Sequence, residues 1–344
     1  MESNKRLSII YHFPCFDGAF AAINSYLYYS KFAKTKYNIQ FVPIQNNTSK
    51  IKAFENADKV ILLDLSLLED EYDYLMEHQN ISVLMIDHHI SGINLYKKNE
   101  EKINKRSKKI KTVLNELNIK SACGLSFRYF KAKAEKKDNK ENVDSVYSDN
   151  YNEINKYVED GDTGAFLLKN INEFRSGLIK QYHPIESVCD FSKPNYIHKI
   201  NNLLDLNLKF TIRTGEKSCR QFHQKAKSSL LRNKVYLIQL PNEIKFLCII
   251  SENKQFRNIL CPFLGKISLK YGFFPIGGCV YHFERDLYKM SLRTSTKGAY
   301  DVSKLCSQLG GGGHADAASF TMTFPEIKKM IVREMSIENE INKL

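Results

Sequence analysis

Short apolar runs alternate with helix-like stretches over the first part of the chain, residues 1–90. The runs are "LSIIYHF", "IQFVPI", "KVILLDL" and "ISVLMID". After the first run, Phe20, Ile23 and Leu27 recur at the spacing of one helix face, and a second helical pattern separates the third and fourth runs. Continuous apolar runs joined by helices are typical of parallel strands that are buried on both faces of a sheet. The pattern predicts an α/β fold, in which sites lie beyond the carboxyl ends of the strands.

Side chains that can ligate a metal follow three of these runs. His12 and Asp17 lie in "YHFPCFDG", Asp64 ends "VILLD", and residues 87–89 complete "MIDHH". Alone, a strand-end aspartate such as Asp64 is more often a helix cap, and a lone His12 is more often a core histidine. The Asp-His-His triplet differs, because three polar groups at a buried edge cost several kcal/mol unless they are paired or ligate a metal. We expect metal and phosphate chemistry at this edge.

The middle of the chain is predicted to be helical, with two polar insertions. The Lys- and Asn-rich segments near 97–118 and 133–150 are expected to be mobile surface loops, the first partly helical and the second disordered. The acidic segment "VEDGDTG" ends a helix, and its Asp162 reaches the metal edge if the chain folds back. A first domain over 1–168 is followed by a mostly helical connector over 169–234.

A second, smaller α/β domain is predicted over 235–344. Its expected strands are "KVYLIQL", "IKFLCIIS", "FFPIGGCVYHF", "LYKMSLRTS" and a last one entered from "GGGGHADAASF". Helices are expected in "QFRNILCPFLGKI", in "DVSKLCSQL" and over 325–341. We therefore expect a domain that mixes helices and strands.

Four glycines in succession precede His314 in this second domain. Glycine lets backbone amides approach an anion closely, and the imidazole of His314 can donate to a phosphate. Upstream, Arg293 in "SLRTS" offers a planar guanidinium that suits phosphate. A glycine run can also be a flexible linker, but here a helix and a strand pattern flank it closely. We expect an anion site without a Walker-type loop, because no Lys-Ser or Lys-Thr pair follows the glycines.

Composition narrows the class of protein only slightly. The net charge of +13 suits an anionic partner, although Lys-rich solvated loops explain it equally well. The eight cysteines form no CxxC pair, so we expect buried, reduced thiols. No apolar stretch approaches the roughly 18 residues of a membrane span. These features favour a cytoplasmic protein with no membrane partner.

Taken in order, "YHFPCFDG", "VILLDL", "MIDHH", "EDGDTG" and "SLRTS…GGGGHADAASF" resemble the DHH phosphoesterase superfamily with a C-terminal DHHA1 domain. The resemblance covers most of the chain apart from the polar insertions. It implies an N-terminal parallel-sheet DHH domain, a mixed α/β DHHA1 domain and an active-site cleft between them. It also implies hydrolysis that depends on Mn²⁺ or Mg²⁺, with one or two ions per chain.

The resemblance also assigns roles to individual residues. The implied metal ligands are His12, Asp17, Asp64, His88 and Asp162, with Asp64 bridging and also counted as catalytic. His89 would lie at the scissile phosphate, and Asp87 would orient its neighbours. The distal phosphate or nucleotide would be held by Arg293, Gly311, Gly312, Gly313 and His314, with Ser251 and Asn258 as weaker candidates.

Cys15 departs from the family pattern, which has the first aspartate of Asp-x-Asp at this position. The side chain could ligate as a thiolate, could pack, or could leave one metal position weakened. We expect it to pack, because a thiolate prefers softer metals than Mn²⁺.

The expected protein is an enzyme that hydrolyses short oligonucleotides or nucleotide phosphoesters with metal-activated water, as an oligoribonuclease or exonuclease does. One alternative is an exopolyphosphatase or pyrophosphatase, and another is a nucleotide-binding regulatory module with a decayed metal site. Phe256, Phe273 and Tyr281 are candidates for a base platform. The expected partner is a short RNA or DNA oligonucleotide or a nucleotide. The choice among substrates and the oligomeric state, including a homodimer, stay open.

Overall fold

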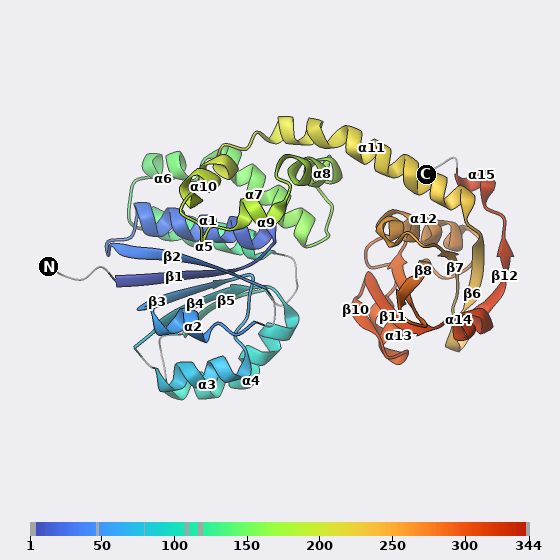
Figure 1. Ribbon diagram of the computed structural model, residues 1–344, viewed down its shortest axis with the longest axis horizontal. Coiled ribbons are helices and arrows are strands. Elements are labelled where there is room, and N and C mark those ends of the chain that lie inside the picture. The colour runs from blue at the N-terminus through green and yellow to red at the C-terminus, as the bar shows by residue number, and fades with distance from the viewer. Residues whose placement is uncertain (1–4, 46–47, 79, 107–109, 116–119, 342–344) are drawn as a thin grey trace. The chain divides into compact units, whose positions relative to one another are not determined.

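The computed structural model describes residues 5–45, 48–78, 80–106, 110–115 and 120–341. The chain divides into two compact units, residues 1–218 and 219–344. The division falls within the long helix α11 (Leu208–Arg232). Figure 1 labels the elements of both units. None of the helices among the described residues has the length and apolar character to cross a membrane.

The first unit is built on a five-stranded parallel sheet in the order β2-β1-β3-β4-β5. Its strands are β1 (Lys5–His12), β2 (Tyr37–Ile44), β3 (Lys59–Leu63), β4 (Ser82–Asp87) and β5 (Ile110–Leu114). Successive residues of a strand bury opposite faces: Ile9 and Ile61 pack in one core cluster, whereas Ile10 and Leu62 pack in the other. Burial on both faces explains the uninterrupted apolar runs, and the predicted parallel sheet is confirmed.

Helices cover both faces of this sheet (Figure 1). One face carries α2 (Ile51–Glu55), α3 (Glu69–Glu77) and α4 (Ile90–Arg106). The other carries α1 (Phe16–Lys31), α5 (Ala122–Glu135), α6 (Lys140–Val146), α7 (Asp149–Asp162), α8 (Ile171–Gln181), α9 (Ile185–Cys189) and α10 (Tyr196–Leu204). The two-sided arrangement leaves the carboxyl ends of the central strands β1, β3 and β4 at one edge.

The prediction that 133–150 is a disordered loop is wrong, because the segment forms the end of α5, all of α6 and the start of α7. Asn139 and Ser148 cap α6 and α7 by accepting hydrogen bonds from the backbone amides of Asn142 and Tyr151. Between the caps, Tyr147 is buried in the core. A few anchoring residues thus order a segment whose overall composition is polar.

The other polar insertion is also not simply a loop. Residues 97–106 continue α4, and 110–114 form the edge strand β5, which pairs with β4. Residues 107–109 and 116–119 of the predicted insertion lie outside the described residues. The strand was missed because "KIKTVL" carries Lys residues, which are ordinary on an edge strand that is open on one side.

The second unit is a mixed sheet in the order β10-β11-β9-β8-β7-β6-β12, with only β7 and β8 parallel. Its strands are β6 (Val235–Gln239), β7 (Lys245–Ile250), β8 (Ile276–Glu284), β9 (Leu287–Thr294), β10 (Gly312–His314), β11 (Ala317–Thr323) and β12 (Ile331–Met335). Its helices are η1 (Pro241–Glu243), η2 (Lys254–Phe256), α12 (Arg257–Lys270), α13 (Val302–Gln308), α14 (Phe324–Met330) and α15 (Glu338–Ile341). The predicted mixed α/β class of this part is confirmed.

The single C-terminal helix predicted over 325–341 is wrong. Helix α14 ends at Met330, and Ile331–Met335 forms β12, which pairs antiparallel with β6. The β-branched Ile331 and Val332 favour a strand, and the open edge of β6 supplies the hydrogen-bonding partner that a short sequence window does not reveal.

Candidate metal centre

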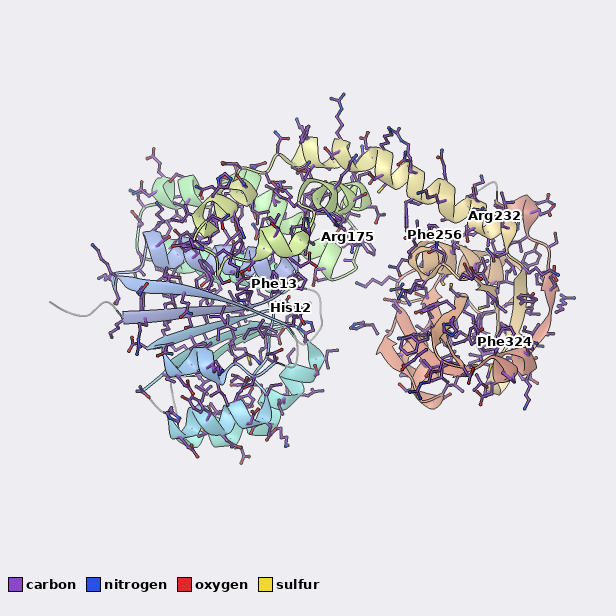
Figure 2. The ribbon with its side chains drawn as sticks, in the orientation of Figure 1. His12, Phe13, Arg175, Arg232, Phe256 and Phe324 are labelled. Atoms are coloured by element: carbon purple, nitrogen blue, oxygen red, sulfur yellow. The ribbon has the colours of Figure 1, made fainter. Side chains whose placement is uncertain are left out.

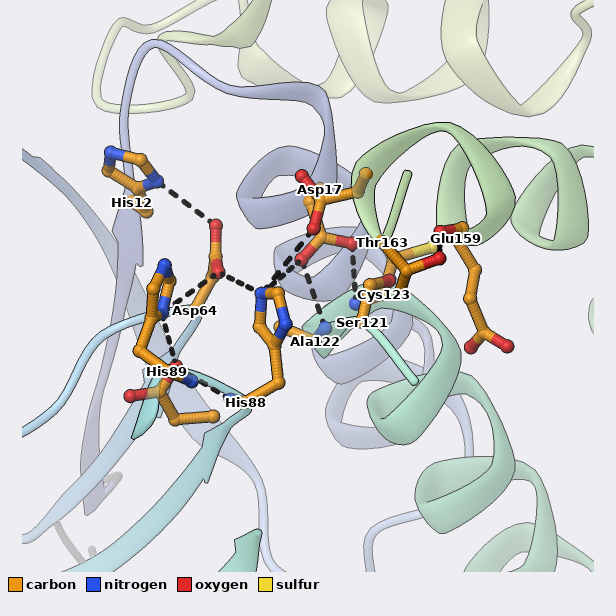
Figure 3. A network of polar contacts seen from close by, with 12 residues as sticks. His12, Asp17, Asp64, His88, His89, Ser121, Ala122, Cys123, Glu159 and Thr163 are labelled. Carbon is orange, nitrogen blue, oxygen red and sulfur yellow. Dashed lines mark hydrogen bonds and ion pairs between the residues drawn. The ribbon is translucent and has the colours of Figure 1, made fainter. Parts of the chain in front are cut away.

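Three parallel strands deliver the acidic and imidazole side chains to one edge of the sheet. His12 ends β1, Asp64 follows β3, and Asp87 ends β4, with His88 and His89 immediately after it. Strand β3 lies between β1 and β4, so these ends are neighbours. Figure 3 shows the resulting cluster with Asp64 at its centre.

Asp64 is contacted by three imidazoles. Its Oδ2 lies 3.0 Å from Nδ1 of His12, and its Oδ1 lies 3.3 Å from Nε2 of His88 and 3.8 Å from Nδ1 of His89. Its backbone has a φ of 59°, in the left-handed region that non-glycine residues seldom adopt. Its backbone amide donates to the carbonyl of Ile86 at 3.0 Å, which holds the turn in place. A strained backbone that turns a carboxylate into a cluster of ligands is characteristic of functional sites.

His88 joins Asp64 to two further carboxylates. Its Nε2 lies 3.4 Å from Oδ2 of Asp162 and 3.9 Å from Oδ2 of Asp17. Asp162 belongs to the last turn of α7, where a negative charge is unfavourable next to the helix C-terminus. A cation at the cluster would offset that cost.

Asp17 is held by the start of another helix. Its carboxylate accepts hydrogen bonds from the backbone amides of Ala122 at 2.9 Å and Cys123 at 3.0 Å, at the N-terminus of α5. The neighbouring Gly18 packs so closely on β1 that an added Cβ would lie 2.2 Å from the carbonyl oxygen of His12. Only glycine allows α1 to approach His12 this closely.

Asp87 is fully buried and binds both histidines that follow it. Its Oδ1 accepts from the His88 amide at 2.8 Å and lies 2.7 Å from Nδ1 of His89, while its Oδ2 accepts from the hydroxyl of Ser66. The hydrogen bond that His89 donates to Asp87 raises the pKa of His89. The imidazole is thereby oriented and more readily protonated.

The electrostatics of the cluster favour a cation. Burial raises the pKa of Asp17 and of Asp162, and the charge of Asp64 raises both further. Burial acts in the same direction on Asp64, but its close contacts with His12 and His88 bring its pKa below the usual value. The buried Oδ1 of Asp64 accepts no hydrogen bond. Acids crowded around an unsatisfied carboxylate oxygen fit a divalent metal ion.

The structure brings together every predicted metal ligand. Three groups of residues could each hold an ion, because within each group the donor atoms lie within 4.8 Å of one another. The groups are His12 with Cys15 and Asp64, Asp64 with His88 and His89, and Asp17 with His88 and Asp162. Asp64 is common to two groups and is therefore well placed to bridge two ions. The presence of Cys15 in the first group was not expected.

A cavity of about 300 Å³ opens beside Asp17 and Asp162 in the first unit. Its lining adds Phe16 and Tyr157 to the carboxylates, together with Arg175 of α8. Figure 2 shows Arg175 on the helix side of the strand end that carries His12. Arg175 was missed in the sequence because an isolated arginine on a helical pattern carries no signal of its own.

Three of the predicted phosphate-binding residues of the second unit, Arg293, Asn258 and His314, lie near one end of its sheet. Nη2 of Arg293 donates to Oδ1 of Asn258 at 3.2 Å. In the strand register, both Arg293 and His314 lie opposite Ala317. Their role in binding phosphate stays a prediction.

The glycine run has a structural reason of its own. An added Cβ at Gly311 would lie 2.2 Å from the carbonyl oxygen of Ser319, and Gly313 has a φ of 144°. Gly312–His314 forms the short exposed strand β10 against β11. Gly311 and Gly313 are therefore needed for close strand pairing, whether or not they bind an anion.

The predicted base platform lies elsewhere in the second unit. Phe256 and Tyr281 line a cavity of about 690 Å³ together with Ser251, and Phe256, Arg232 and Phe324 of its lining are labelled in Figure 2. Tyr281 is four residues further along β8 than Gly277, the residue opposite Arg293. At about 3.3 Å per residue, the backbone of Tyr281 lies roughly 13 Å along β8 from the position opposite Arg293, whereas Ser251 lines the same cavity as Tyr281.

The open α/β sheet and the cluster of carboxylates and imidazoles at its edge define the class: a metal-dependent phosphoesterase. Residues 6–150 match the family model described as "DHH family, N-terminal domain". The match lies within the first unit. The predicted identity of the second unit as a DHHA1 domain, and the cleft between the units, stay predictions.

Similar proteins are distant in sequence. The exonuclease RecJ bound to manganese has a TM-score of 0.52 at 13% identity, and the match covers 100% of this chain and 92% of that one. The pGpG-specific phosphodiesterase PggH from Vibrio cholerae has a TM-score of 0.47 at 14% identity, covering 94% of this chain and 95% of that one. An uncharacterised protein, R106, of Acanthamoeba polyphaga mimivirus is 24% identical over 341 residues, which span 92% of this chain and 67% of the relative. The RecJ similarity establishes a shared fold.

Proposed function

We propose that the protein hydrolyses short oligonucleotides or nucleotide phosphoesters at the metal centre of its first unit. The observation that carries this proposal is the cavity beside Asp17 and Asp162, which combines carboxylates with aromatic and aliphatic walls. A polyphosphate chain needs only cationic groups, whereas a nucleotide also presents a flat base to be covered. The apolar lining of the cavity, with Phe16 and Tyr157, favours a substrate that carries a base.

The metal ligands proposed for this reaction are His12, Asp17, Asp64, His88 and Asp162. A bound Mn²⁺ or Mg²⁺ supplies a hydroxide nucleophile near neutral pH and stabilises the charge that develops on the phosphate. The other proposed roles belong to His89, Asp87 and Arg175, and they follow from the contacts of these side chains.

His89 is the proposed acid for the leaving oxygen. Its Nδ1 is bound to Asp87, so its Nε2 is the nitrogen left to face the substrate. The raised pKa keeps the imidazole protonated to a higher pH than an ordinary histidine, which suits donation to an alkoxide leaving group. Asp87 acts through His89 and is a positioning residue.

Arg175 is proposed to neutralise a non-bridging phosphate oxygen. Its guanidinium lies 5.3 Å from the ring centre of Phe166 and reaches the cavity lining next to Gly161. A planar guanidinium against an aromatic ring is a stable arrangement for holding a phosphate near a base.

Product analysis on a small panel of anions tests the proposal. The purified chain is incubated with Mn²⁺ and a di- or trinucleotide RNA, the matching DNA, a linear dinucleotide, adenosine bisphosphate or polyphosphate. Asp64→Asn is run in parallel, and Asp286→Asn, an exposed carboxylate in the second unit, serves as the matched control. We expect nucleotide release that Asp64→Asn abolishes and Asp286→Asn leaves unchanged.

Two results would contradict the proposal. Phosphate release from polyphosphate alone would favour the phosphoanhydride hydrolase. Nucleotide binding without turnover of any substrate, in protein loaded with Mn²⁺, would favour the regulatory module. Arg175→Gln separates substrate binding from metal binding, since we expect a higher KM with an unchanged affinity for Mn²⁺.

A further inference from the structure

Cys15 differs in its surroundings from most other cysteines of the chain. Six of the eight are buried, and Cys248, Cys261, Cys279 and Cys306 lie in the apolar cores of the second unit. Cys15 instead lies half-buried between β1 and α1, and its Sγ belongs to the donor group formed with His12 and Asp64. An acidic, histidine-containing environment is a poor site for a thiol that only packs.

A second observation at the same place points to a ligand. The carboxylate of Asp64 is only 2% exposed as a residue, yet its Oδ1 accepts no hydrogen bond. A buried carboxylate oxygen without a hydrogen bond costs free energy unless a cation completes its surroundings. Such a cation would lie next to Asp64, the residue shared by the group of His12 and Cys15 and the group of His88 and His89.

The backbone around Cys15 also supports an anion at sulfur. Cys15 is the N-cap residue of α1, a helix of 16 residues. The dipole at a helix N-terminus stabilises a thiolate.

We propose that Cys15 is a metal ligand and that the two ion positions bridged by Asp64 differ chemically. One position has a sulfur-containing set of His12, Cys15 and Asp64. The other has Asp17, His88 and Asp162 in addition to Asp64. Thiolate and imidazole select Zn²⁺, Fe²⁺ or Co²⁺, whereas the carboxylate-rich set suits Mn²⁺ or Mg²⁺.

Binding of the softer ion releases the proton of the thiol to solvent and forms a metal–sulfur bond, with no change of oxidation state. The proposal takes the alternative of ligation, whereas the expectation from the sequence was that Cys15 packs. The inference rests on the metal centre of the proposed function but not on its substrate.

Cobalt spectroscopy of the full chain tests the inference without any substrate. Addition of Co²⁺ to metal-free protein is expected to produce a near-ultraviolet sulfur-to-cobalt charge-transfer band. The band should be absent in Cys15→Ser and Cys15→Asp. It should persist in Cys219→Ser, which changes the other partly exposed cysteine, and in Asp17→Asn, which changes the oxygen-rich position.

Metal affinities give a second readout. In Cys15→Asp we expect the affinity for Zn²⁺ to fall by about tenfold or more while Mn²⁺ binding is retained, because an aspartate still supplies an oxygen ligand. This variant also keeps the test decisive if Cys15→Ser fails to fold. Circular dichroism establishes that each variant is folded.

The outcomes separate this inference from the proposed function. Cobalt bound without a charge-transfer band, or a band that survives the loss of Cys15, would overturn the inference even if the protein hydrolyses nucleotides. A Cys15-dependent band in a protein that turns over no substrate would support the inference while contradicting the proposed function.

Discussion

Removing one carboxylate from the cluster should have opposite effects on stability with and without metal. Ligand oxygens of Asp17 and Asp162 lie within 4.8 Å of each other. Two unit charges at that distance repel by about 3 kcal/mol at an effective dielectric constant of about 20. Partial protonation, reflected in the raised pKa values of both groups, and the loss of the Asp162–His88 contact reduce the gain. We expect Asp162→Asn to stabilise the metal-free protein by roughly 1 kcal/mol.

Bound metal should make the wild type more stable than Asp162→Asn. An ion present at 100 times its dissociation constant stabilises the wild type by about 2.7 kcal/mol. The variant lacks one ligand and should gain much less. For a unit of this size, each kcal/mol moves the melting temperature by about 2–4 °C. Thermal denaturation in EDTA and in Mn²⁺ should therefore give crossed results, with the variant melting higher in EDTA and lower in Mn²⁺.

The exposed Asp286→Asn serves as the charge-matched control and should melt like the wild type in both conditions. The reasoning would be refuted by an Asp162→Asn variant that is less stable in EDTA and still gains the full stabilisation from Mn²⁺. That result would mean that Asp162 is held by its contact with His88 and not by an ion.

Three further predictions follow from other contacts. The pKa of Asp162 is raised in the folded state, so its destabilising negative charge is present above that pKa and is lost as pH falls through it. In EDTA, the extra stability of Asp162→Asn over the wild type should shrink over the same pH range. Urea denaturation at several pH values measures this difference. Asp87→Asn should lower the pKa of His89, so that activity declines at a lower pH than in the wild type as the pH is raised. An unchanged alkaline limit of the kcat profile would exclude His89 as the acid. The Glu71 carboxylate is fully buried and lies 3.1 Å from Nζ of the equally buried Lys50; Glu71→Ala should therefore cost about 3–5 kcal/mol in urea denaturation, and Glu77→Ala on the exposed end of the same helix should cost little.

Local patterns were sufficient for the strands β1, β3 and β4 and for most of the cluster. The runs that end at His12, Asp64 and Asp87 are continuous because both sheet faces are buried, and the order of parallel strands brings their ends to one edge. Asp17 follows from the same logic, since it starts the helix after β1. Composition misled the prediction for 133–150, where two caps and a buried Tyr147 outweigh many polar residues.

Contacts between distant segments decided the rest. The strand β12 exists because β6 has an open edge, and that edge is about a hundred residues away in the chain. Arg175 reaches the cavity only because α8 packs beside α7, and Cys15 meets Asp64 only because β1 and β3 are neighbours. The sequence by itself determined the central strands of the first sheet and the residue types that end them, because periodicity acts over a few residues. Only the tertiary structure decided which side chains share one ion, because that depends on distances of a few ångströms between segments that no local pattern connects.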